Sequence, residues 1–396
     1  MSTREPEFPL TRAEIDLEAL AHNCRLLRER ISPGAKLMAV VKADAYGHGL
    51  VPVSRVCVEN GASFLGVACL TEAIRLRQAG IEAPILLFGY SPGRYAGHLA
   101  RYDIRASVHS LAAARALSTE AALIRKRITV HIKIDTGMGR LGLPAYAATL
   151  GPRPRARMRE VVSEAAAIAR LPWLFVEGIY THFSCADDPD TSRTESQLAL
   201  FMEILDELER RSIEFELRHA ANSAATLRMP STHLDMVRPG ISLYGLSPAE
   251  GVGREACGLR PVMSVKSAVI QVREVPAGFR VSYGGRWQSS KPTRIAVVPI
   301  GYADGYKRSL SSNAEMLVGG KRAPVVGTVC MDLTMIEVGD LPSVAVEDEV
   351  VVLGSQGGEE ITAEEIARRI GTIHYEVVSS LTARIPRLYM PCPEHP

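Results

Sequence analysis

Short apolar runs alternate with longer helical stretches through the first two thirds of the chain. Between about residue 12 and residue 250, each apolar run ends in polar residues or glycine, and a stretch rich in Ala, Leu, Arg and Glu usually follows. Such alternation is typical of strands that are each followed by a helix. The eight apolar runs begin near Lys36, Phe64, Pro84, Ile104, Ile128, Leu174, Phe215 and Leu234. Clear helical stretches between them are TEAIRLRQAG (71–80) and LAAARALSTEAALIRKR (111–127).

Eight strand–helix units in about 240 residues match the size of a (β/α)8 barrel, which usually has about 250 residues. A doubly wound parallel sheet is the alternative, because spacing along the chain cannot show whether a sheet closes. We therefore predict an α/β fold with an N-terminal TIM-like (β/α)8 barrel over residues 12–256.

The pattern changes after Leu259. Apolar runs such as VMSVKSAVIQVREV (262–275), RIAVVPIGYADGY (294–306) and DEVVVLG (348–354) follow each other closely and are broken by Gly, Pro and Asp. This spacing favours a mainly antiparallel C-terminal β domain over residues 257–396, and we expect residues 1–11 to pack with it. Its one clear helix is TAEEIARRIG, where Thr362 and Glu365 have the spacing of a capping box.

Composition and charge exclude several classes of partner. The chain has 396 residues, of which 46% are hydrophobic and 23% charged, as is ordinary for a globular protein of two domains. A net charge of +2 gives no basic field of the kind that binds nucleic acid or an anionic membrane. The densest basic segment holds Arg153, Arg155, Arg157 and Arg159 among prolines, and we expect it to be a solvated loop.

The N-terminus and the cysteines favour a cytoplasmic protein. MSTREPEFPLTRAEID has acidic residues and two prolines where a signal peptide needs an apolar run, and no apolar stretch reaches the roughly 18 residues of a membrane helix. The seven cysteines are odd in number and contain no C-x-x-C pair. They suit reduced thiols and predict neither a disulfide framework nor a metal site.

A lysine stands at the end of the first predicted strand, where a barrel active site is expected. Lys42 follows the apolar run in AVVKADAYGHG, so we expect its amine to be partly desolvated. A desolvated amine loses its proton more easily and can attack a carbonyl. Alone the signal is weak, since a strand-end lysine in a surface ion pair is at least as common.

The segment VVKADAYGHG (40–49) closely resembles the lysine segment that binds pyridoxal 5′-phosphate in alanine racemases. The resemblance continues, in the family's order, along nearly the whole chain. Further matching segments are VHIKIDTGMGRLG (130–142), EGIYTHFSCAD (177–187), RHAANSAATL (218–227), VRPGISLYGL (237–246), VSYGG (281–285), PIGYADGY (299–306), GTVCMD (327–332), TIHYE (372–376) and ARIPRLY (383–389). The resemblance implies a pyridoxal-phosphate enzyme that interconverts L-alanine and D-alanine.

The resemblance implies two groups that carry protons on opposite faces of the substrate. Lys42 would form the Schiff base with the cofactor and act as one proton acceptor, and Tyr283 would be the opposing acid/base. The family supplies this tyrosine from the partner subunit of a head-to-tail homodimer. His219 would bond to the tyrosine, and Arg238 would contact the histidine.

The resemblance also assigns the residues around the cofactor. Arg238 would donate to the pyridine nitrogen, and because arginine is only a donor it would keep that nitrogen unprotonated. His182 would lie against the ring. The phosphate would be bound by Tyr46, Ser223, Gly240, Ile241 and Tyr375. From the residues alone, Ser223 is only a candidate N-cap of the following helix.

Substrate recognition is implied for residues of both predicted domains. Arg140 and the N–H of Met331 would bind the substrate carboxylate, since a guanidinium suits a planar carboxylate. Tyr302 and Tyr375 would form a gate that admits alanine and disfavours larger side chains.

Lys133 matches a lysine that many relatives carry as an N-carboxylate. This modification would turn a cation into an anion able to hold the guanidinium of Arg140. The alternative is an unmodified Lys133 paired with a neighbouring carboxylate such as Asp135.

Two features depart from the family pattern. Thr328 stands where many relatives have an arginine that lines the access corridor, which would weaken electrostatic steering of the substrate. The segment between Leu143 and Val161 is longer than usual, and we expect an insertion on a barrel loop.

Three other functions share this plan. A pyridoxal-phosphate decarboxylase of basic amino acids would carry a G-P-x-C-(D/E) motif, which is absent from this sequence. A serine-preferring or broad-specificity racemase would differ at the gate residues, and a non-catalytic pyridoxal-phosphate-binding protein would resemble the barrel alone. Supply of D-alanine for peptidoglycan is the implied role, although catabolic relatives use the same residues.

Overall fold

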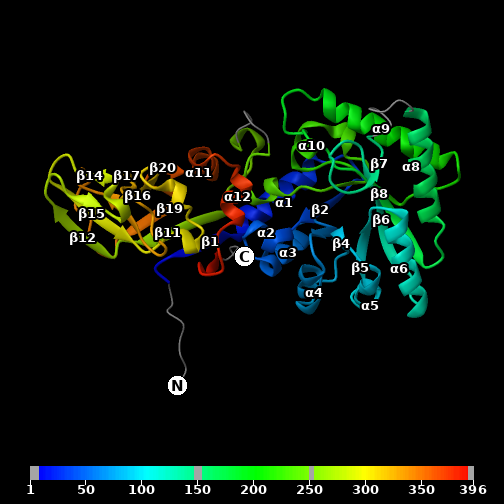
Figure 1. Ribbon diagram of the computed structural model, residues 1–396, viewed down its shortest axis with the longest axis horizontal. Helices are drawn as coiled ribbons and strands as arrows, with labels where there is room; N and C mark the ends of the chain where they lie inside the picture. The colour runs from blue at the N-terminus through cyan, green and yellow to red at the C-terminus, as the bar shows by residue number, and fades with distance from the viewer. Residues whose placement is uncertain (1–8, 147–153, 249–253, 391–396) are drawn as a thin grey trace, which may run out of the picture. The chain divides into compact units, whose positions relative to one another are not determined.

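The computed structural model describes residues 9–146, 154–248 and 254–390, which form two compact units (Figure 1). The first unit consists of Leu20–Ala45 and Leu50–Arg260. The second unit consists of the chain up to Ala19, Tyr46–Gly49 and the chain from Pro261 onward. The chain therefore contributes to the second unit twice before it reaches Pro261.

Eight parallel strands form the barrel of the first unit, and they coincide with the eight apolar runs. They are β2 (Lys36–Val40), β3 (Phe64–Val67), β4 (Ile85–Tyr90), β5 (Ile104–Val108), β6 (Ile128–Asp135), β8 (Leu174–Tyr180), β9 (Leu217–His219) and β10 (Met236–Val237). Hydrogen-bonded neighbours follow the order β10-β2-β3-β4-β5-β6-β8-β9, and the short β7 (Leu143–Pro144) pairs with β6. The N–H of Asp235 donates to the carbonyl of Arg218 at 3.0 Å and nearly closes the ring. The predicted barrel is confirmed, and the doubly wound alternative is wrong.

Helices follow most of the strands and lie outside them (Figure 1). They are α1 (Leu17–Arg30), α3 (Leu50–Glu59), α4 (Leu70–Gln78), α5 (Ala96–Arg101), α6 (Leu111–Leu123), α8 (Pro154–Ala169), α9 (Ser192–Glu209) and α10 (Ser223–Arg228). The two predicted helical stretches correspond to α4 and α6. Helix α6 begins after Ser110, whose hydroxyl accepts from the N–H of Ala113 at 3.2 Å. Across the ranges that the structure describes, no helix is both long and apolar enough to cross a membrane.

The arginine-rich segment is helical, so the predicted solvated loop is wrong. Helix α8 begins at Pro154 and includes Arg155, Arg157 and Arg159, while Arg153 lies outside the described residues. Proline is tolerated in the first turn of a helix, because its missing N–H would have no helical partner there. Pro154 therefore marks the start of a helix.

The segment that we expect to be an insertion lies only partly within the described residues. Leu143 is in β7 and Val161 is in α8, so the segment joins two elements between the barrel strands β6 and β8. Residues 147–153 lie outside the description.

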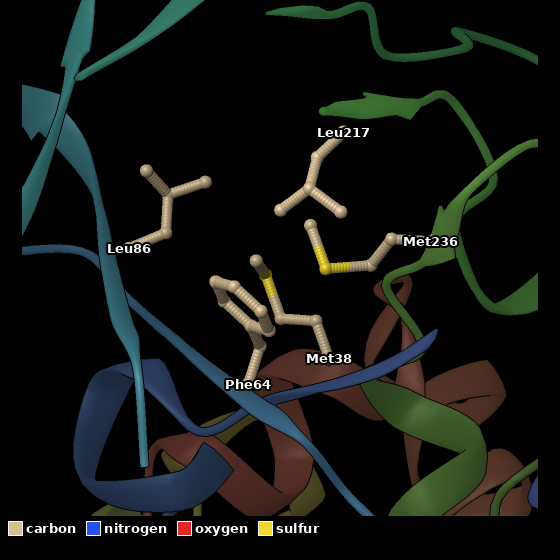
Figure 2. Close-up of a cluster of buried hydrophobic side chains, with 5 residues drawn as sticks. All are labelled: Met38, Phe64, Leu86, Leu217 and Met236. Carbon is tan, nitrogen blue, oxygen red and sulfur yellow. The ribbon is translucent and has the colours of Figure 1, made fainter. Parts of the chain in front are cut away.

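An apolar cluster fills one side of the barrel interior. Met38, Phe64, Leu86, Leu217 and Met236 come from β2, β3, β4, β9 and β10, and their side chains point toward one another (Figure 2). All five are buried. Such a cluster excludes water, which strengthens the electrostatic interactions of polar groups elsewhere in the same interior.

The second unit is mainly antiparallel β structure, as predicted. Its strands are β1 (Arg12–Asp16), β11 (Met263–Ala268), β12 (Gln271–Val275), β13 (Arg280–Val281), β14 (Trp287–Gln288), β15 (Thr293–Val298), β16 (Glu315–Val318), β17 (Lys321–Pro324), β18 (Thr334–Glu337), β19 (Glu349–Gln356), β20 (Glu359–Ile361) and β21 (Arg387–Met390). The largest sheet has the order β17-β16-β19-β11-β1-β21, with β20 beside β19. The strands β12, β15 and β18 form a second sheet, and β13 pairs with β14.

Strand β1 belongs to this largest sheet, whereas the sequence pattern predicts that the barrel begins at residue 12. It pairs antiparallel with β11 and parallel with β21. Ala13 and Ile15 are fully buried, and the residues beside them are partly or fully exposed. This alternation is typical of a strand with one buried face, whereas a barrel strand is covered on both faces.

Two helices accompany the sheets of the second unit. The hydroxyl of Thr362 accepts from the N–H of Glu365 at 3.0 Å, which confirms the predicted start of α11 (Ala363–Ile370). Helix α12 (His374–Ser379) is not predicted from the sequence, because six residues are too few to establish a helical period.

Candidate active site

The chain makes a left-handed turn directly after the first barrel strand. Residues 43–46 have φ angles between 52° and 55°, in the segment that begins at Lys42 and is labelled α2 in Figure 1 (Lys42–Tyr46). This conformation costs L-residues about 1–2 kcal/mol each. The N–H of Asp44 donates to Oε1 of Glu72 at 3.3 Å, and Oδ1 of Asp44 accepts from the N–H of Leu50 at 3.1 Å. These bonds hold the strained turn next to Lys42.

The amine of Lys42 is placed to lose its proton. Burial is the main cause that lowers the pKa of Lys42, the positive charge of Arg140 lowers it further, and the carboxylate of Glu72 opposes both. A lysine whose neutral form is favoured is a better nucleophile toward a carbonyl carbon. The lowered pKa confirms the partial desolvation expected for a lysine at the end of a barrel strand.

The carboxylate of Asp135 folds the loop that carries Arg140. Its Oδ1 accepts the N–H groups of Gly137, Met138 and Gly139 at 3.0, 2.8 and 3.1 Å. Its Oδ2 accepts the N–H of Arg140 at 3.0 Å. Both carboxylate oxygens are thus engaged by backbone amides.

Lys133 is buried and makes no ion pair with another described residue, although the charge of Asp135 acts on its amine. Its side chain is 5% exposed, and in the described ranges no hydrogen bond or ion pair joins its amine to Asp135 or to another residue. The amine lies 5.7 Å from the ring centroid of Tyr180. Burial, followed by the charges of Arg140 and Arg238, lowers the pKa of Lys133 to about 8. A neutral amine is therefore populated close to neutral pH.

Arg238 is buried in the barrel and donates to several acceptors. Its Nη1 donates to Nδ1 of His219 at 2.8 Å, and its Nη2 donates to the carbonyls of Thr181 at 2.7 Å and Ala220 at 2.9 Å. Nη2 also lies 3.4 Å from Nδ1 of His182. Burial lowers the pKa of Arg238 to about 10, so the guanidinium stays charged at neutral pH. Within the described ranges, the Nε of Arg238 has no such acceptor and remains available as a donor.

The implied bond between His219 and Tyr283 is wrong. Nδ1 of His219 accepts from Arg238, and Nε2 of His219 is hydrogen-bonded to Nδ1 of His131 at 2.8 Å. Nε2 of His131 is bonded in turn to Glu177 at 2.9 Å. An imidazole has only two ring nitrogens, and both nitrogens of His219 are occupied inside the barrel.

His131 and Glu177 are site residues that the sequence analysis did not single out. A signal was present in HIKID, where His131, Lys133 and Asp135 alternate with two buried isoleucines along β6. Polar residues at a period of two on a fully buried strand must find partners inside the barrel.

Tyr180 is a further residue that the sequence analysis missed. Its ring stacks on that of His219, with centroids 4.7 Å apart and planes 5° apart. The guanidinium carbon of Arg238 lies 5.2 Å from the centroid of the Tyr180 ring. The hydroxyl of Tyr180 is hydrogen-bonded to the hydroxyl of Ser107 at 2.8 Å. Tyr180 thus fixes the plane of His219 while it faces the charge of Arg238.

A hydroxyl and backbone amides converge where β9 gives way to α10. The Oγ of Ser223 accepts from the N–H of Gly240 at 2.8 Å and from that of Ser242 at 3.5 Å. Ile241 lies between these two amides, and the hydroxyl of Ser242 is buried without a partner among the described residues. The N-cap of α10 is Asn222, one residue before the candidate Ser223. The converging donors fit a phosphate group.

The Tyr283 side chain is exposed, and its loop is anchored through the backbone. Tyr283 is 73% exposed within the single chain. The hydroxyl of Thr328 donates to the carbonyl of Tyr283 at 2.9 Å, and that of Ser282 donates to the carbonyl of Thr328 at 2.6 Å. Thr328 is buried and supports the tyrosine loop.

Tyr302 and Met331 lie on neighbouring loops of the second unit. The N–H of Tyr302 donates to the carbonyl of Cys330 at 3.1 Å, and the N–H of Ala303 donates to that of Met331 at 3.0 Å. Tyr302 is 41% exposed and Met331 is 52% exposed. For the N–H of Met331, we find no acceptor among the described residues. This amide can therefore donate to a bound carboxylate.

Tyr46 and Tyr375 come together in the second unit. Their ring centroids are 6.1 Å apart. Burial raises the pKa of Tyr46 to about 12, which keeps its hydroxyl protonated and able to donate. Two phenols side by side suit the oxygens of a phosphate.

The donor set of the barrel fits pyridoxal 5′-phosphate. The cofactor has an aldehyde, a phosphate and a pyridine nitrogen, which need an amine, several N–H or O–H donors and a donor, respectively. Lys42, the cluster around Ser223 and Arg238 supply these groups within one unit.

Six of the seven cysteines are described, and all six are free thiols. No group of three or more His, Cys, Asp or Glu side chains in the described ranges could hold a metal ion.

Both units match known protein families. Residues 15–248 match the N-terminal domain of alanine racemase, and residues 262–389 match its C-terminal domain. The alanine racemase of Desulfosudis oleivorans is 50% identical over 377 residues, which is 95% of this chain and 96% of that protein. The alanine racemase of Desulforamulus reducens is 46% identical over 378 residues, 96% of this chain and 98% of that protein.

Solved structures give the same result. The alanine racemase of Streptomyces lavendulae, a D-cycloserine producer, is 38% identical, with a TM-score of 0.90 over 98% of this chain and 99% of that chain. That of Bacillus anthracis is 36% identical, with a TM-score of 0.88 over 98% of this chain and 96% of that chain. The chain therefore belongs to the alanine racemase family of isomerases.

Proposed function

We propose that this chain interconverts L-alanine and D-alanine with pyridoxal 5′-phosphate as its cofactor. One observation carries the proposal. The amine of Lys42, whose pKa is lowered, and the donor-only guanidinium of Arg238 belong to the same unit. When bound, the cofactor supplies an electron-withdrawing ring that makes the Cα–H of an amino acid acidic.

The residues that would hold the cofactor are those with suitable donors. Lys42 would hold it through its amine, and Arg238 would donate its free Nε–H to the ring nitrogen. His182 would lie against the ring. The phosphate would be held by the hydroxyls of Tyr46, Ser223 and Tyr375 and by the backbone amides of Gly240 and Ile241.

Racemisation needs one group to remove the Cα proton and another to deliver a proton to the opposite face. Lys42 and Tyr283 would be these two groups. Tyr283 would come from a second copy of the chain, so that the working form is a homodimer with shared sites. The 73% exposure of Tyr283 in the single chain supports this arrangement, because a partner surface could cover it.

The substrate carboxylate would be bound by the guanidinium of Arg140 and by the N–H of Met331. Tyr302 and Tyr375 would restrict the space beside the substrate side chain. The alanine racemase of Bacillus anthracis was solved with bound L-Ala-P, which supports a small amino-acid-like ligand here. The proposed role is the supply of D-alanine for peptidoglycan in the cytoplasm.

Lys133 would carry an N-carboxylate. Its buried amine, with the pKa lowered to about 8, can attack carbon dioxide in its neutral form and release a proton. The resulting anion would offset the positive charges of Arg140, Arg238 and Lys42, which together with burial outweigh the nearby charge of Asp135 at Lys133.

The test is a coupled assay of the purified protein with L-alanine and with L-serine. We expect conversion of alanine to exceed that of serine. Lys42→Ala should abolish activity and the visible absorbance of the lysine-bound cofactor, and Tyr283→Phe should keep the absorbance but lose most activity. Full activity in Tyr283→Phe would falsify the two-base assignment.

Mixing two inactive variants tests whether the sites are shared. In a mixed dimer of Lys42→Ala and Tyr283→Phe, one of the two sites would contain both intact residues. Random re-association should therefore restore about a quarter of the wild-type activity. Absence of any recovery, with mixed dimers verified by mass spectrometry, would count against shared sites.

A further inference from the structure

A continuous line of hydrogen bonds crosses the barrel interior. Nη1 of Arg238 lies 2.8 Å from Nδ1 of His219, and Nε2 of His219 lies 2.8 Å from Nδ1 of His131. Nε2 of His131 lies 2.9 Å from Oε2 of Glu177, which also accepts from Nε of Arg105 at 3.2 Å. Both histidines are fully buried. We call these five residues the buried chain.

The two ends of the buried chain determine where its protons lie. Arg238 can only donate, so Nδ1 of His219 is an acceptor and the proton of this ring is on Nε2. That N–H donates to Nδ1 of His131, whose own proton must then be on Nε2. The second N–H donates to Glu177. Every bond between Arg238 and Glu177 therefore points from the guanidinium toward the carboxylate, and Arg105 donates to the same carboxylate from the other side.

Both imidazoles are held neutral by this arrangement. A proton on Nδ1 of His219 would face the N–H of Arg238, and a proton on Nδ1 of His131 would face the N–H of His219. Burial is the main cause that lowers the pKa of each histidine, and the charge of Arg238 adds to it. Burial raises the pKa of Glu177, but the bond from His131 and the charge of Arg105 outweigh it, so its pKa lies below the ordinary value.

We propose that His131 and Glu177 are positioning residues for Arg238. They fix the tautomer of His219, so that its Nδ1 lone pair always faces the guanidinium and leaves the Nε–H of Arg238 directed at the cofactor. This inference rests on the proposed function only in the role given to Arg238. A histidine that could change its tautomer would present an N–H to Arg238 and displace the guanidinium.

A purely structural role for the buried chain would have a different signature. Arg105 is on β5, His131 on β6 and Glu177 on β8, so their bonds also connect neighbouring strands. In that case, any substitution that removes equivalent buried bonds from the barrel should have the same effect. His233 offers this control because it is 1% exposed, Nδ1 bonds to Ser32 at 3.0 Å and Nε2 to the carbonyl of Thr226 at 2.9 Å.

The first measurement is the tautomer of His219, read by 15N NMR of histidine-labelled protein without and with pyridoxal phosphate. In the wild type we expect a bare Nδ1 and a protonated Nε2 on both His219 and His131. Spectra of His219→Asn and His131→Phe assign the signals. In His131→Phe the His219 signals should move toward a mixture of tautomers. This readout does not require racemase activity, so failure of the proposed function leaves it intact.

The second measurement is the kinetics of the cofactor-loaded variants. In metal sites, removing the hydrogen-bond partner behind a functional histidine typically lowers metal affinity or activity about 10–100-fold, and we expect the same scale of effect on kcat here. We expect His131→Phe to lower kcat by about tenfold or more at a nearly unchanged KM for L-alanine. His131→Gln should recover most of this loss, because its amide can accept from His219 and donate to Glu177. His233→Phe should lower the melting temperature to a similar extent and leave kcat close to wild type.

Two results would overturn the inference. One is an unchanged His219 tautomer together with wild-type kcat in His131→Phe. The other is an equal loss of kcat in His131→Phe and His233→Phe. If His131→Phe does not fold, Glu177→Leu and Glu177→Gln give the same contrast, since only the glutamine keeps an acceptor for His131. Equal kcat and equal tautomers in these two variants would also reject the proposal.

Discussion

The barrel interior and the loops of the second unit hold their functional groups in opposite ways. Arg238 is 4% exposed and is fixed by bonds to His219, Thr181 and Ala220. Tyr283 is 73% exposed, and its loop is anchored through a backbone carbonyl. The barrel groups are thus pre-organised and have shifted pKa values. The second unit presents groups that need a covering surface before they can act in a dry site.

The largest effect should follow the loss of the buried cation. In Arg238→Met, three buried acceptors lose a charged donor, so we expect the free energy of unfolding to fall by about 3 kcal/mol. Activity should fall at least about 100-fold at the same time. Urea unfolding and the racemisation assay measure the two quantities. Arg157→Met on the exposed face of α8 is the control, and there we expect a change of at most about 0.5 kcal/mol. Similar losses in both variants would contradict the assignment of Arg238.

In the second unit, activity and stability should separate. Tyr283→Phe should lower activity by about 10²–10⁴-fold, since it removes an acid/base group. Its free energy of unfolding should stay within about 0.5 kcal/mol of wild type, because the Tyr283 hydroxyl has no hydrogen-bond partner among the described residues of its own chain. Tyr180→Phe makes the same change inside the barrel and should lower stability by about 1–2 kcal/mol through its bond to Ser107. The contrast disappears if both variants are equally destabilised.

The sequence predicts the fold better than it predicts the partners inside the site. The eight strands and the start of α11 follow from local pattern, because each depends on neighbouring residues. His131 and His219 are 88 residues apart, and their rings meet only because β8 pairs with both β6 and β9. Resemblance names His219 as a site residue, but it cannot show that both ring nitrogens are already in use. The assignment of β1 to the barrel is wrong for a related reason, since the strands that pair with β1 come from the last third of the chain.

The titration of Lys133 should make the free energy of unfolding depend on pH, and the Lys133→Met variant should lack this dependence. In the fold its pKa is about 8, below the ordinary value of 10.5. Between these values the folded protein binds fewer protons than the unfolded chain, so stability rises with pH across the window from about 8 to 10.5. In buffer free of carbon dioxide, the melting temperature of the wild type relative to Lys133→Met should rise across this window. Added bicarbonate should reduce that slope, because an N-carboxylate removes the titrating amine. A constant difference at all pH values would reject the lowered pKa.

The smallest effect should come from the buried hydroxyl behind Tyr283. Thr328→Val removes its donation to the Tyr283 carbonyl, which is worth about 1 kcal/mol. Thr328→Ser keeps the donor and serves as the control. If the tyrosine loop is held mainly by a partner surface, activity should fall no more than the small loss of stability implies. A much larger loss of activity in Thr328→Val, absent in Thr328→Ser, would mean that one buried hydrogen bond pre-organises Tyr283. The functional groups of the two units would then be held more alike than the exposed fractions of Arg238 and Tyr283 suggest.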